Sequence, residues 1–530
     1  KNVANLKNTL TKIKGLIDKN SFADAQKLCI SKEKFFSEVW HYQYFFGLSL
    51  YLSNKKKESI KRFQKAVALG GDEFYLYFYL VMSYLETSQP DKALKSLQTA
   101  VEKIHDDEKH KYSAKIGKLF FTVESYTEGI YWYQKAILTN PNDLELYLQL
   151  AGALSRIQKP REAIKVYLEA FQLAPSNAKV NFNISKTMKL LRELRSSLKH
   201  YEIAFKLDPE VFDPAHALML TCSLLEFDKR ECYGAEIKKT IINGEHLSEP
   251  FSSLFFLDEP KLLLDANKNY SANFSNKPLC KLKKNQNSKI RIGYLSSDLK
   301  NHATSYLIRS LIQKHDRRRF EIFGFSYSVK QNTSYQAFIE NSFDELLDVM
   351  TLTNHQVAEK IVESNIDILV DLKGHTESSR PGILRLKPAK IQINYLGYPG
   401  TSGIPEMDYI IGDRIVTPHE SSHNFSEKIV QLPCCYQPND PWREVTRPEL
   451  ITRKDAGLPG SAFTFCCFNH HWKYTPEIMR AWAEILKRCP DSVLWLLQPI
   501  AEIDFKSILS NFKIPQIRVI TAPIVPIEKH

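Results

Sequence analysis

The segment Ser296–Ser305 carries residue types that can move a proton. It reads SSDLKNHATS, with Asp298 and His302 four residues apart after a short apolar run. A carboxylate and an imidazole at such a turn can share the handling of one proton. Thr304 or Ser305 can cap the following helix, whose amide end faces an anion. Because aspartates are equally common as turn and cap formers, other loops must support this interpretation.

Two further segments could meet the first one at the edge of a sheet. Asp371–Thr376 follows another apolar run and again holds an aspartate and a histidine, His375. Leu396–Gly403 contains three glycines, and its second half, Gly400-Thr401-Ser402-Gly403, could bring backbone close to a ligand. The order of its glycines is not G-x-G-x-x-G and it has no Walker lysine, so it is not a standard phosphate loop. A tight turn without a ligand is the structural alternative.

A fourth segment, Phe468–Lys473, ends directly before a predicted helix start. Lys473 beside a helix N-terminus is suited to neutralise a pyrophosphate leaving group. His470 and His471 suggest a metal, but adjacent residues rarely converge on one ion and the sequence offers no third ligand. It also has no D-x-D pair of carboxylates. We therefore expect no metal site and no cofactor.

Alternating strand and helix patterns place these segments. Apolar runs predict three strands in the first region, at Ile290–Leu295, Glu321–Tyr327 and Ile366–Val370. Helices are predicted between them, at Ser305–Lys314 and His355–Glu363. Such alternation indicates a parallel doubly wound sheet, which binds ligands at the carboxyl ends of its strands.

A second strand and helix set begins at Ala462. It comprises strands Phe463–Cys467, Val493–Leu497 and Ile517–Thr521, with helices Pro476–Arg488 and Ile503–Leu509. A Rossmann-like lobe usually has more strands than this. We therefore expect a lobe that is incomplete within this sequence.

The N-terminal region repeats with a period near 34 residues. Alanines recur at intervals of 34, 36, 34 and 34 residues, at Ala66, Ala100, Ala136, Ala170 and Ala204. Three residues before each alanine stands a large side chain: Phe63, Leu97, Tyr133, Tyr167 and Tyr201. Small residues at other fixed offsets, Gly47 among them, would let helices approach closely. The pattern resembles tetratricopeptide (TPR) hairpins over residues 38–209, with a degenerate hairpin near Phe22–Phe36. An irregular helical bundle is the alternative.

Length and pattern changes predict four regions. A chain of 530 residues is too long for one core. We assign residues 1–209 to a TPR superhelix and 210–288 to a helical transition with a polar linker, in which Asn267–Ser288 resembles a surface loop. Residues 289–445 form the first Rossmann-like lobe, and 446–530 begin the second. The chain starts with Lys1 and not Met, so we expect it to be part of a longer protein.

Composition narrows the possible partners. The net charge of +12 and a pI near 9.0 invite a nucleic-acid interpretation. However, the clusters at 281–284 and 317–319 do not alternate with aromatic residues, so we expect no nucleic acid. No secretory signal or membrane-length apolar run is present, and we expect no membrane partner. Nine cysteines without a C-x-x-C pair fit reduced thiols and a cytoplasmic protein.

Several of these motifs together resemble the O-GlcNAc transferase and SPINDLY family. The matching segments are Ile292–Asp298 with Asn301-His302, Leu386–Ala389, Leu396–Gly403, Met407–Ile410, Phe468-Asn469 with Lys473, and Pro490–Leu497. They occur in the family's order across residues 289–530, behind the family's usual TPR array. The resemblance implies an α + α/β chain, in which a TPR α-solenoid precedes a GT-B pair of Rossmann-like lobes. It also implies an inverting, metal-independent glycosyltransferase that modifies Ser or Thr of proteins.

The resemblance also implies roles for individual residues. Lys473 would stabilise the departing diphosphate, with Asn469 and His470 beside it. His302 and Thr304 would line the sugar and phosphate pocket, Asn301 would lie near the acceptor, and Asp298 would remove or relay a proton. Gly400, Thr401, Ser402 and Gly403 would form a wall around the donor sugar.

The sequence also departs from the animal members. His470 stands where they carry glutamine, and Asp258 occupies the region of a histidine between their repeats and first lobe. His375 within Gly-His-Thr matches SPINDLY and bacterial relatives. The family's nucleotide-base site would lie after His530, so we expect part of the donor pocket outside this sequence.

The resemblance leaves the donor and the acceptor open. UDP-GlcNAc is the expected donor, and protein or peptide acceptors would bind along the TPR groove of a chain that could form homo-oligomers. An O-fucosyltransferase using GDP-fucose, an asparagine glucosyltransferase using UDP-glucose and a non-catalytic TPR scaffold are the alternatives.

Overall fold

The computed structural model describes residues 2–87, 89–208, 213–274, 278–279, 288–331, 333–441, 452–499 and 503–525. They form two compact units, Lys1–Thr187 and Met188–His530, which are described separately. The lysine cluster at 281–284 and the predicted boundary at 445 lie outside the described residues. The three predicted domain boundaries stay predictions.

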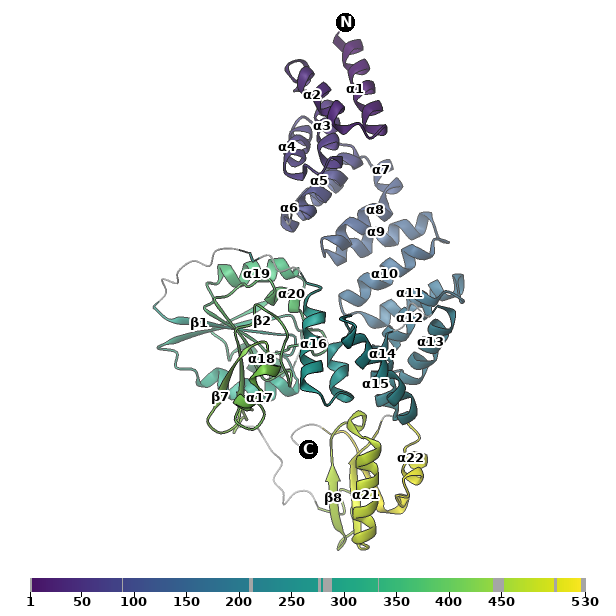
Figure 1. The fold of residues 1–530 in the computed structure, drawn as a ribbon, viewed down its shortest axis with the longest axis vertical. Helices are drawn as coiled ribbons and strands as arrows, with labels where there is room; N and C mark the ends of the chain where they lie inside the picture. Colours follow the sequence, from purple (N-terminus) through teal and green to yellow (C-terminus); the bar gives the residue numbers. More distant parts are fainter. Residues whose placement is uncertain are drawn as a thin grey trace. The chain divides into compact units, whose positions relative to one another are not determined.

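The first unit is a row of antiparallel helical hairpins (Figure 1). Its helices are α1 (Asn2–Asp18), α2 (Phe22–Phe36), α3 (Trp40–Leu52), α4 (Lys56–Ala68), α5 (Phe74–Glu86), α6 (Pro90–Lys103), α7 (Asp106–Lys111), α8 (Ser113–Thr122), α9 (Tyr126–Thr139), α10 (Leu144–Arg156) and α11 (Pro160–Leu173), while α12 (Ala178–Leu190) crosses into the second unit. The degenerate hairpin predicted near Phe22–Phe36 is α1 with α2. The short helix α7 lies in the one repeat that is 36 residues long, so it explains the longer interval before Ala136.

The second unit begins with helices that support both of its sheets. These are α13 (Leu194–Leu207), α14 (Pro214–Leu224), α15 (Phe227–Ile242), the 3₁₀ helix η2 (Pro250–Phe255) and α16 (Pro260–Ser271). Tyr201 and Ala204 of α13 are fully buried, as the repeat pattern predicts. The prediction of a surface loop from Asn267 onward is wrong at its start, because Asn267 is a buried residue of α16.

Seven parallel strands form the larger sheet, in the order β3-β2-β1-β4-β5-β6-β7. The strands are β1 (Ile290–Ser296), β2 (Phe320–Ser326), β3 (Glu345–Asp348), β4 (Ile368–Asp371), β5 (Ile391–Asn394), β6 (Tyr409–Asp413) and β7 (Lys428–Leu432). The predicted doubly wound topology is confirmed, but the strand predicted as the third of this sheet is β4. Four of its strands, β3, β5, β6 and β7, were not predicted. Strand β3 was missed because it is a four-residue edge strand whose ends are charged. The strand order reverses between β1 and β4, where such sheets place their ligands.

Helices cover both faces of this sheet. Helices α19 (Asn354–Glu363) and α20 (Pro381–Leu384) lie on one side, and α17 (Ala303–Lys314) and α18 (Ser334–Glu340) lie on the other (Figure 1). Neighbouring residues of a strand point to opposite faces, so each strand contributes side chains to the apolar cores on both sides of the sheet. Leu295 packs in the core with α19 and α20, whereas Tyr294 packs in the core with α17 and α18.

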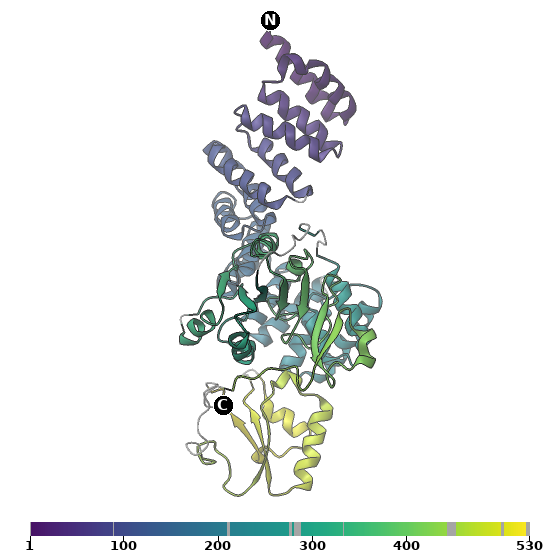
Figure 2. The ribbon, with the colours of Figure 1, turned by 90° about the vertical axis from the view of Figure 1, so that its left-hand side faces the viewer.

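The smaller sheet agrees closely with its prediction. It has the order β10-β9-β8, with β8 (Phe463–Cys467), β9 (Ser492–Leu497) and β10 (Val519–Ala522) all parallel. Helices α21 (Pro476–Arg488) and α22 (Phe505–Asn511) flank it, and together they form the yellow part of the chain in Figure 2. The helical repeats and the parallel, Rossmann-like sheets confirm the predicted fold class.

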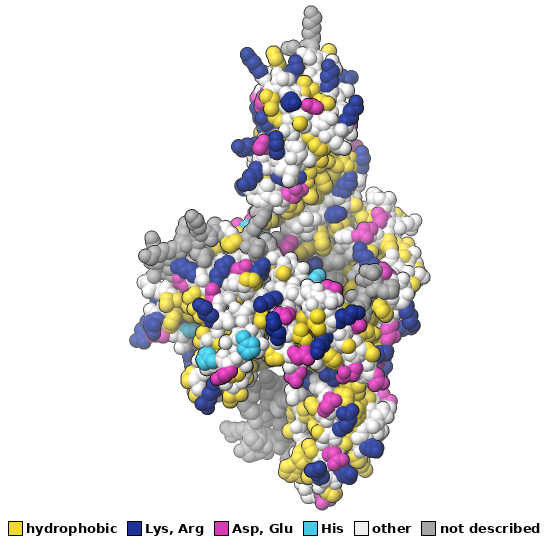
Figure 3. Space-filling view, viewed as in Figure 1, with side chains coloured by type: hydrophobic (Ala, Val, Ile, Leu, Met, Phe, Trp, Pro, Cys, Tyr) yellow, Lys and Arg dark blue, Asp and Glu magenta, His cyan; other side chains and the backbone are white. Residues whose placement is uncertain are grey.

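The surface mixes charges of both signs. Lys and Arg side chains are interspersed with Asp and Glu on the face shown in Figure 3. Within the arginine cluster, Arg317 pairs with Asp344 and Arg318 pairs with Asp316. These pairs reduce the positive field that a nucleic acid would need. Among the described helices, we find none that is both long and apolar enough to cross a membrane.

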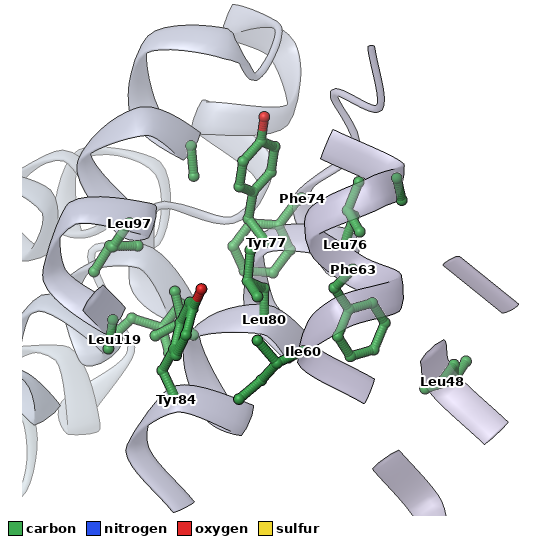
Figure 4. Packing of buried hydrophobic residues seen from close by; sticks show 14 of the residues in the cluster. Leu48, Ile60, Phe63, Phe74, Leu76, Tyr77, Leu80, Tyr84, Leu97 and Leu119 are labelled. Atoms are coloured by element: carbon green, nitrogen blue, oxygen red, sulfur yellow. The ribbon is translucent and has the colours of Figure 1, made fainter. Parts of the chain in front are cut away.

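Small residues of the repeats contact large ones from the partner helix. A Cβ atom added at Gly47 of α3 would lie 2.7 Å from the ring of Phe63, which is fully buried in α4. Phe63 and Leu97 belong to one continuous core with Leu76 and Leu80 (Figure 4). The predicted packing of small against large side chains is therefore confirmed for this hairpin.

Gly47→Ala should destabilise this hairpin, although alanine is the better helix former by about 1 kcal/mol. The added methyl group must displace the Phe63 ring, and overpacking costs about 1–3 kcal/mol. The matched control is Gly152→Ala in α10, because a Cβ atom added there would meet nothing within 4 Å. This substitution should stabilise helix α10. Hydrogen exchange of peptides from α3 and α10 measures both effects. Equal protection in the two variants would contradict this packing.

Candidate active site

A buried ion pair joins the loops that follow β1 and β4. The ammonium of Lys373 donates a hydrogen bond to a carboxylate oxygen of Asp298 at 2.8 Å. The side chains are 5% and 9% exposed, so each charge compensates the other for the loss of water. The predicted Asp298 thus lies at the switch point of the sheet. Its partner Lys373 was visible in the sequence, but we did not assign it a role.

His302 caps helix α17 beside this pair. Its Nδ1 atom accepts a hydrogen bond from the backbone N–H of Thr304 at 3.2 Å and lies 3.6 Å from Asp298. Burial lowers the pKa of His302, Asp298 opposes this shift, and the charges of Lys373 and Lys300 add to it. The imidazole is therefore neutral near pH 7, with Nδ1 as an acceptor. Its position leaves 43% of the side chain exposed, so a substrate can reach it.

Two other predicted residues lie on the same loop. Asn301 is exposed, and its side-chain oxygen accepts a hydrogen bond from the Tyr306 hydroxyl at 2.6 Å. The backbone N–H of Asn301 donates to Gln331 at 3.1 Å. Thr304 is buried in the first turn of α17. Asn301 and His302 are consequently the accessible groups, and Asp298 and Thr304 lie beneath them.

A second carboxylate, Asp371, supports the loop after β4. It accepts hydrogen bonds from the backbone N–H groups of Lys373 at 3.1 Å and Gly374 at 2.8 Å. Burial raises the pKa of Asp371 to about 6, although these two bonds oppose the shift. Asp371 is 2% exposed and therefore shapes the loop that presents Lys373.

The glycine-rich loop is held by a residue that sequence reasoning missed. Buried Glu427 accepts hydrogen bonds from the Thr401 hydroxyl and the Ser402 backbone N–H, both at 2.6 Å. Gly403 has a φ of +64°, and a Cβ atom there would lie 2.5 Å from the backbone of Asn267. Thr401, Ser402 and Gly403 are buried, whereas Gly400 is half-buried. No sequence motif marks Glu427, because it is a single acidic residue just before β7.

His375 lies behind the same loop. Its Nε2 atom is 2.5 Å from the carbonyl oxygen of Ser402, and its ring packs edge-on against Tyr270 and Tyr398. Burial lowers the pKa of His375, so the ring is neutral near pH 7. Because it is only 4% exposed, His375 braces the loop from within.

Lys473 occupies a short 3₁₀ helix, η5 (His471–Lys473), before α21. Its side chain is exposed and lies 3.4 Å from the Asn469 side-chain oxygen. Thr475 caps α21 by accepting a hydrogen bond from the Ile478 N–H at 3.3 Å. The structure therefore brings Lys473 and Asn469 together at the N-terminal end of α21, where the helix dipole favours an anion.

His470 lies in this positive environment. Its ring stacks on Trp472 with centroids 4.0 Å apart. Burial lowers the pKa of His470, and the charges of Arg192 and Lys473 lower it further. Arg192 precedes α13, and we did not identify it from the sequence because it is far from Lys473 along the chain. Two cations beside one turn give a site suited to a diphosphate.

Aromatic contacts connect the glycine-rich loop to the Lys473 turn. The ring of Tyr398 lies 6.4 Å from that of Phe251, and Phe251 lies 5.4 Å from Phe255. Phe255 in turn lies 6.2 Å from Trp472. Both loops thus pack against η2, so one helical segment supports the two predicted halves of the site.

A hydrogen bond fixes the Lys473 turn to α14. Buried His471 has its Nε2 atom 3.0 Å from the carbonyl oxygen of Ser223. Burial lowers the pKa of His471 to about 4, and the charge of His470 contributes. His471 is therefore neutral and acts as a structural donor, which argues against the metal interpretation of the histidine pair.

This fold joins helical repeats to Rossmann-like sheets whose ligand edge carries Asp, Lys and His. A solved structure of a mutant O-GlcNAc transferase from Thermobaculum terrenum has a similar fold, with a TM-score of 0.52 and 19% identity over 80% of this chain and 76% of that one. The sequence profile of glycosyl transferase family 41 matches residues 272–444 and 442–530. Residues 272–530, slightly under half of the chain, are therefore similar to glycosyl transferase family 41.

Curated relatives agree with this family. The chain is 34% identical over 306 residues to SEC of Arabidopsis thaliana, a probable UDP-N-acetylglucosamine–peptide N-acetylglucosaminyltransferase. The matched region covers 53% of this chain and 31% of that relative. It is 32% identical over 208 residues to the Arabidopsis SPINDLY protein, and this match covers 39% of this chain and 22% of that protein. The chain thus spans less than a third of these relatives. The resemblance seen in the motifs is confirmed.

Breaking the buried pair should destabilise the larger sheet. Asp298→Asn leaves the Lys373 ammonium buried without its counter-ion, which costs about 3–5 kcal/mol. Urea unfolding with hydrogen exchange of β1 and β4 measures the loss, and adding Lys373→Met should recover part of it. The matched control is Asp316→Asn, whose partner Arg318 is 91% exposed, and it should change little. Equal losses in the two single variants would show that the pair does not hold these loops.

Acid should release the Lys473 turn from α14. The folded-state pKa of His471, about 4, is below the usual value of 6.5. The folded chain then binds fewer protons than the unfolded chain, so the stability from this contact is lost as the pH falls from about 6.5 towards 4. Hydrogen exchange at the end of α14 reports the release. The measurement uses a His470→Gln background, so that the stacked ring does not titrate.

His471→Gln in that background keeps a side-chain N–H donor for Ser223 but cannot titrate. Its exchange near Ser223 should therefore depend much less on pH. An unchanged pH profile would refute the role given to His471.

Proposed function

We propose that the protein containing this chain is an inverting glycosyltransferase that moves GlcNAc from UDP-GlcNAc onto Ser or Thr of proteins. The main support is the family match, which spans both sheets and all four predicted loops. The names of the Arabidopsis relatives support UDP-N-acetylglucosamine as the donor and a peptide as the acceptor. In the reaction, the acceptor oxygen forms a bond to the anomeric carbon as the bond to the diphosphate breaks. The bonding electron pair leaves with the diphosphate, and the hydroxyl proton passes to a base.

The Lys473 turn would bind the leaving group. Negative charge grows on the diphosphate as the glycosidic bond breaks, and a fixed cation lowers the energy of that state. Lys473 supplies the cation directly beside the end of α21, with Asn469 as a polar neighbour. Arg192 and His470 would add a second positive charge and a neutral donor.

The loop after β1 would handle the acceptor hydroxyl. His302 is exposed in part and neutral near pH 7, and because its Nδ1 atom accepts from the Thr304 N–H, its Nε2 atom carries the proton and would donate a hydrogen bond to bound substrate. Asp298 lies 3.6 Å from that Nδ1 atom and would remove or relay the hydroxyl proton. Asn301 would position the acceptor from the rim of the same loop. Gly400 is the most accessible of the four residues, Gly400 to Gly403, that are proposed to contact the donor sugar.

The helical repeats would recruit the acceptor protein. TPR-like superhelices bind extended segments along their grooves, and no nucleic acid or membrane is needed for that role. We place the reaction in the cytoplasm, because the described cysteines are free thiols. A homo-oligomer remains compatible with this arrangement.

Other donors and a scaffold role are the competing proposals. His375 favours a SPINDLY-like O-fucosyltransferase that uses GDP-fucose, while UDP-glucose transfer to asparagine is a third possibility. Mass spectrometry of one acceptor peptide incubated with each donor distinguishes them by mass and by modified residue. A scaffold would transfer none of the sugars and would not bind a nucleotide sugar.

Lys473→Ala in the full-length protein should reduce sugar transfer at least about 100-fold, the usual effect of losing one group that stabilises developing charge. Lys487→Ala is the matched control, because this lysine is also exposed but lies near the other end of α21. Mass spectrometry of the acceptor peptide gives the rate. Unchanged transfer by Lys473→Ala would exclude the proposed role of this lysine.

A chelator should leave transfer unchanged, because Lys473 and helix-end amides would replace the divalent ion of metal-dependent transferases. The assay compares initial rates with and without EDTA, then with added Mg²⁺ or Mn²⁺. Activity that is lost with EDTA and restored by either ion would contradict the metal-independent mechanism.

A further inference from the structure

A polar cavity of about 290 Å³ is lined by residues that do not belong to the loops described above. It is formed by the carboxyl ends of β2 and β3 and by α18, with Ser326, Ser328, Gln336, Glu340, Leu346 and Asp348 among its walls. Its volume is near the lower limit of ligand sites, which measure about 300–1,000 Å³. Carboxyl ends of parallel strands are also where doubly wound sheets bind ligands. The family match assigns no role to this cavity.

Two buried polar atoms in its wall have no hydrogen-bond partner among the described residues. They are the hydroxyl oxygen of Ser328 and the side-chain oxygen of Gln336, whose residues are 4% and 6% exposed. The Gln336 amide nitrogen donates to the Leu299 carbonyl at 3.3 Å and to Glu340 at 3.1 Å, which leaves its oxygen as an acceptor. Buried polar atoms are rarely left unpaired. Together they offer a ligand one acceptor and one hydroxyl that can donate or accept.

The other lining groups indicate which ligand fits. Lys330 is accompanied by Glu340 and Asp348, so the acidic groups outnumber the basic one and an anion is disfavoured. Asp348 and Lys330 lie 3.5 Å apart. Among the described lining residues, Leu346 is the one apolar side chain, whereas peptide grooves alternate polar contacts with apolar pockets. A neutral ligand with many hydroxyl groups matches this lining best.

We propose that this cavity binds a neutral carbohydrate ring of about monosaccharide size, as a site separate from the donor loops. Ser328 and Gln336 hydrogen-bond the ring hydroxyls, and the carboxylates and Asn341 bind them at the rim. One lining residue also contacts the loop after β1, because the Gln336 amide donates a hydrogen bond to the Leu299 carbonyl. Sugar bound here would therefore contact a side chain that holds this loop. The proposal does not depend on the transfer reaction.

Methyl NMR of the full chain tests this site, because Leu346 places a methyl probe in the cavity wall. The chain is titrated with N-acetylglucosamine and with glucose in the absence of nucleotide. At least one sugar should shift the Leu346 methyl resonance in a saturable way. Ser328→Ala should weaken that response at least fivefold without lowering the midpoint of thermal unfolding, since the lost hydroxyl has no partner in the folded chain.

Ser342→Ala is the matched control. Ser342 is also buried, but its hydroxyl donates to Phe338 at 2.9 Å and does not line the cavity, so the Leu346 response should persist. The response should also persist in Lys473→Ala, which separates this site from the proposed function. Three results would overturn the proposal: no sugar moves Leu346, Ser328→Ala responds like the unmodified chain, or inorganic phosphate or an acceptor peptide moves Leu346 when the sugars do not.

Discussion

The buried pair of Asp298 and Lys373 is the constraint on which the candidate site depends. It joins the loops after β1 and β4, the two strands between which the order of the sheet reverses. Opposite charges at 2.8 Å with little exposure hold both loops in one arrangement, because separating them would leave each charge buried alone. This arrangement fixes the start of α17 and so presents His302 to solvent.

The helical segment 213–274 gives the second sheet its place in the same unit. Asn267 of α16 donates hydrogen bonds to Tyr398 and to the Thr401 carbonyl, which fastens the glycine-rich loop. Ser223 of α14 and Phe255 of η2 contact the turn that carries Lys473. Loops of both sheets therefore depend on one set of helices. We infer that these helices coordinate the two halves of a transferase site.

The sequence predicted the elements that have strong local signals. Period and residue size located the hairpins, and Pro476 with the preceding threonine located the start of α21. Strand β3 was missed because its four residues offer no apolar alternation. Asp298 and His302 were predicted from their spacing within one loop, which requires no knowledge of distant contacts.

The missed residues share a different property. Lys373, Glu427 and Arg192 act through contacts with segments far away along the chain, so their local sequence gives no sign of them. Glu427 illustrates this, since it holds Thr401 and Ser402 across 25 residues or more. Contacts between residues far apart in the sequence become visible only in the folded structure, whereas a sequence motif shows only residues that are close along the chain.

A crystal structure of the full-length protein with bound UDP-GlcNAc tests the central claim most directly. The account predicts that the Lys473 ammonium contacts the diphosphate and that His302 faces the sugar end of the same molecule, with the Asp298–Lys373 pair intact beneath it. A nucleotide sugar that contacts only one of the two sheets, with His302 or Lys473 remote from it, would contradict the account.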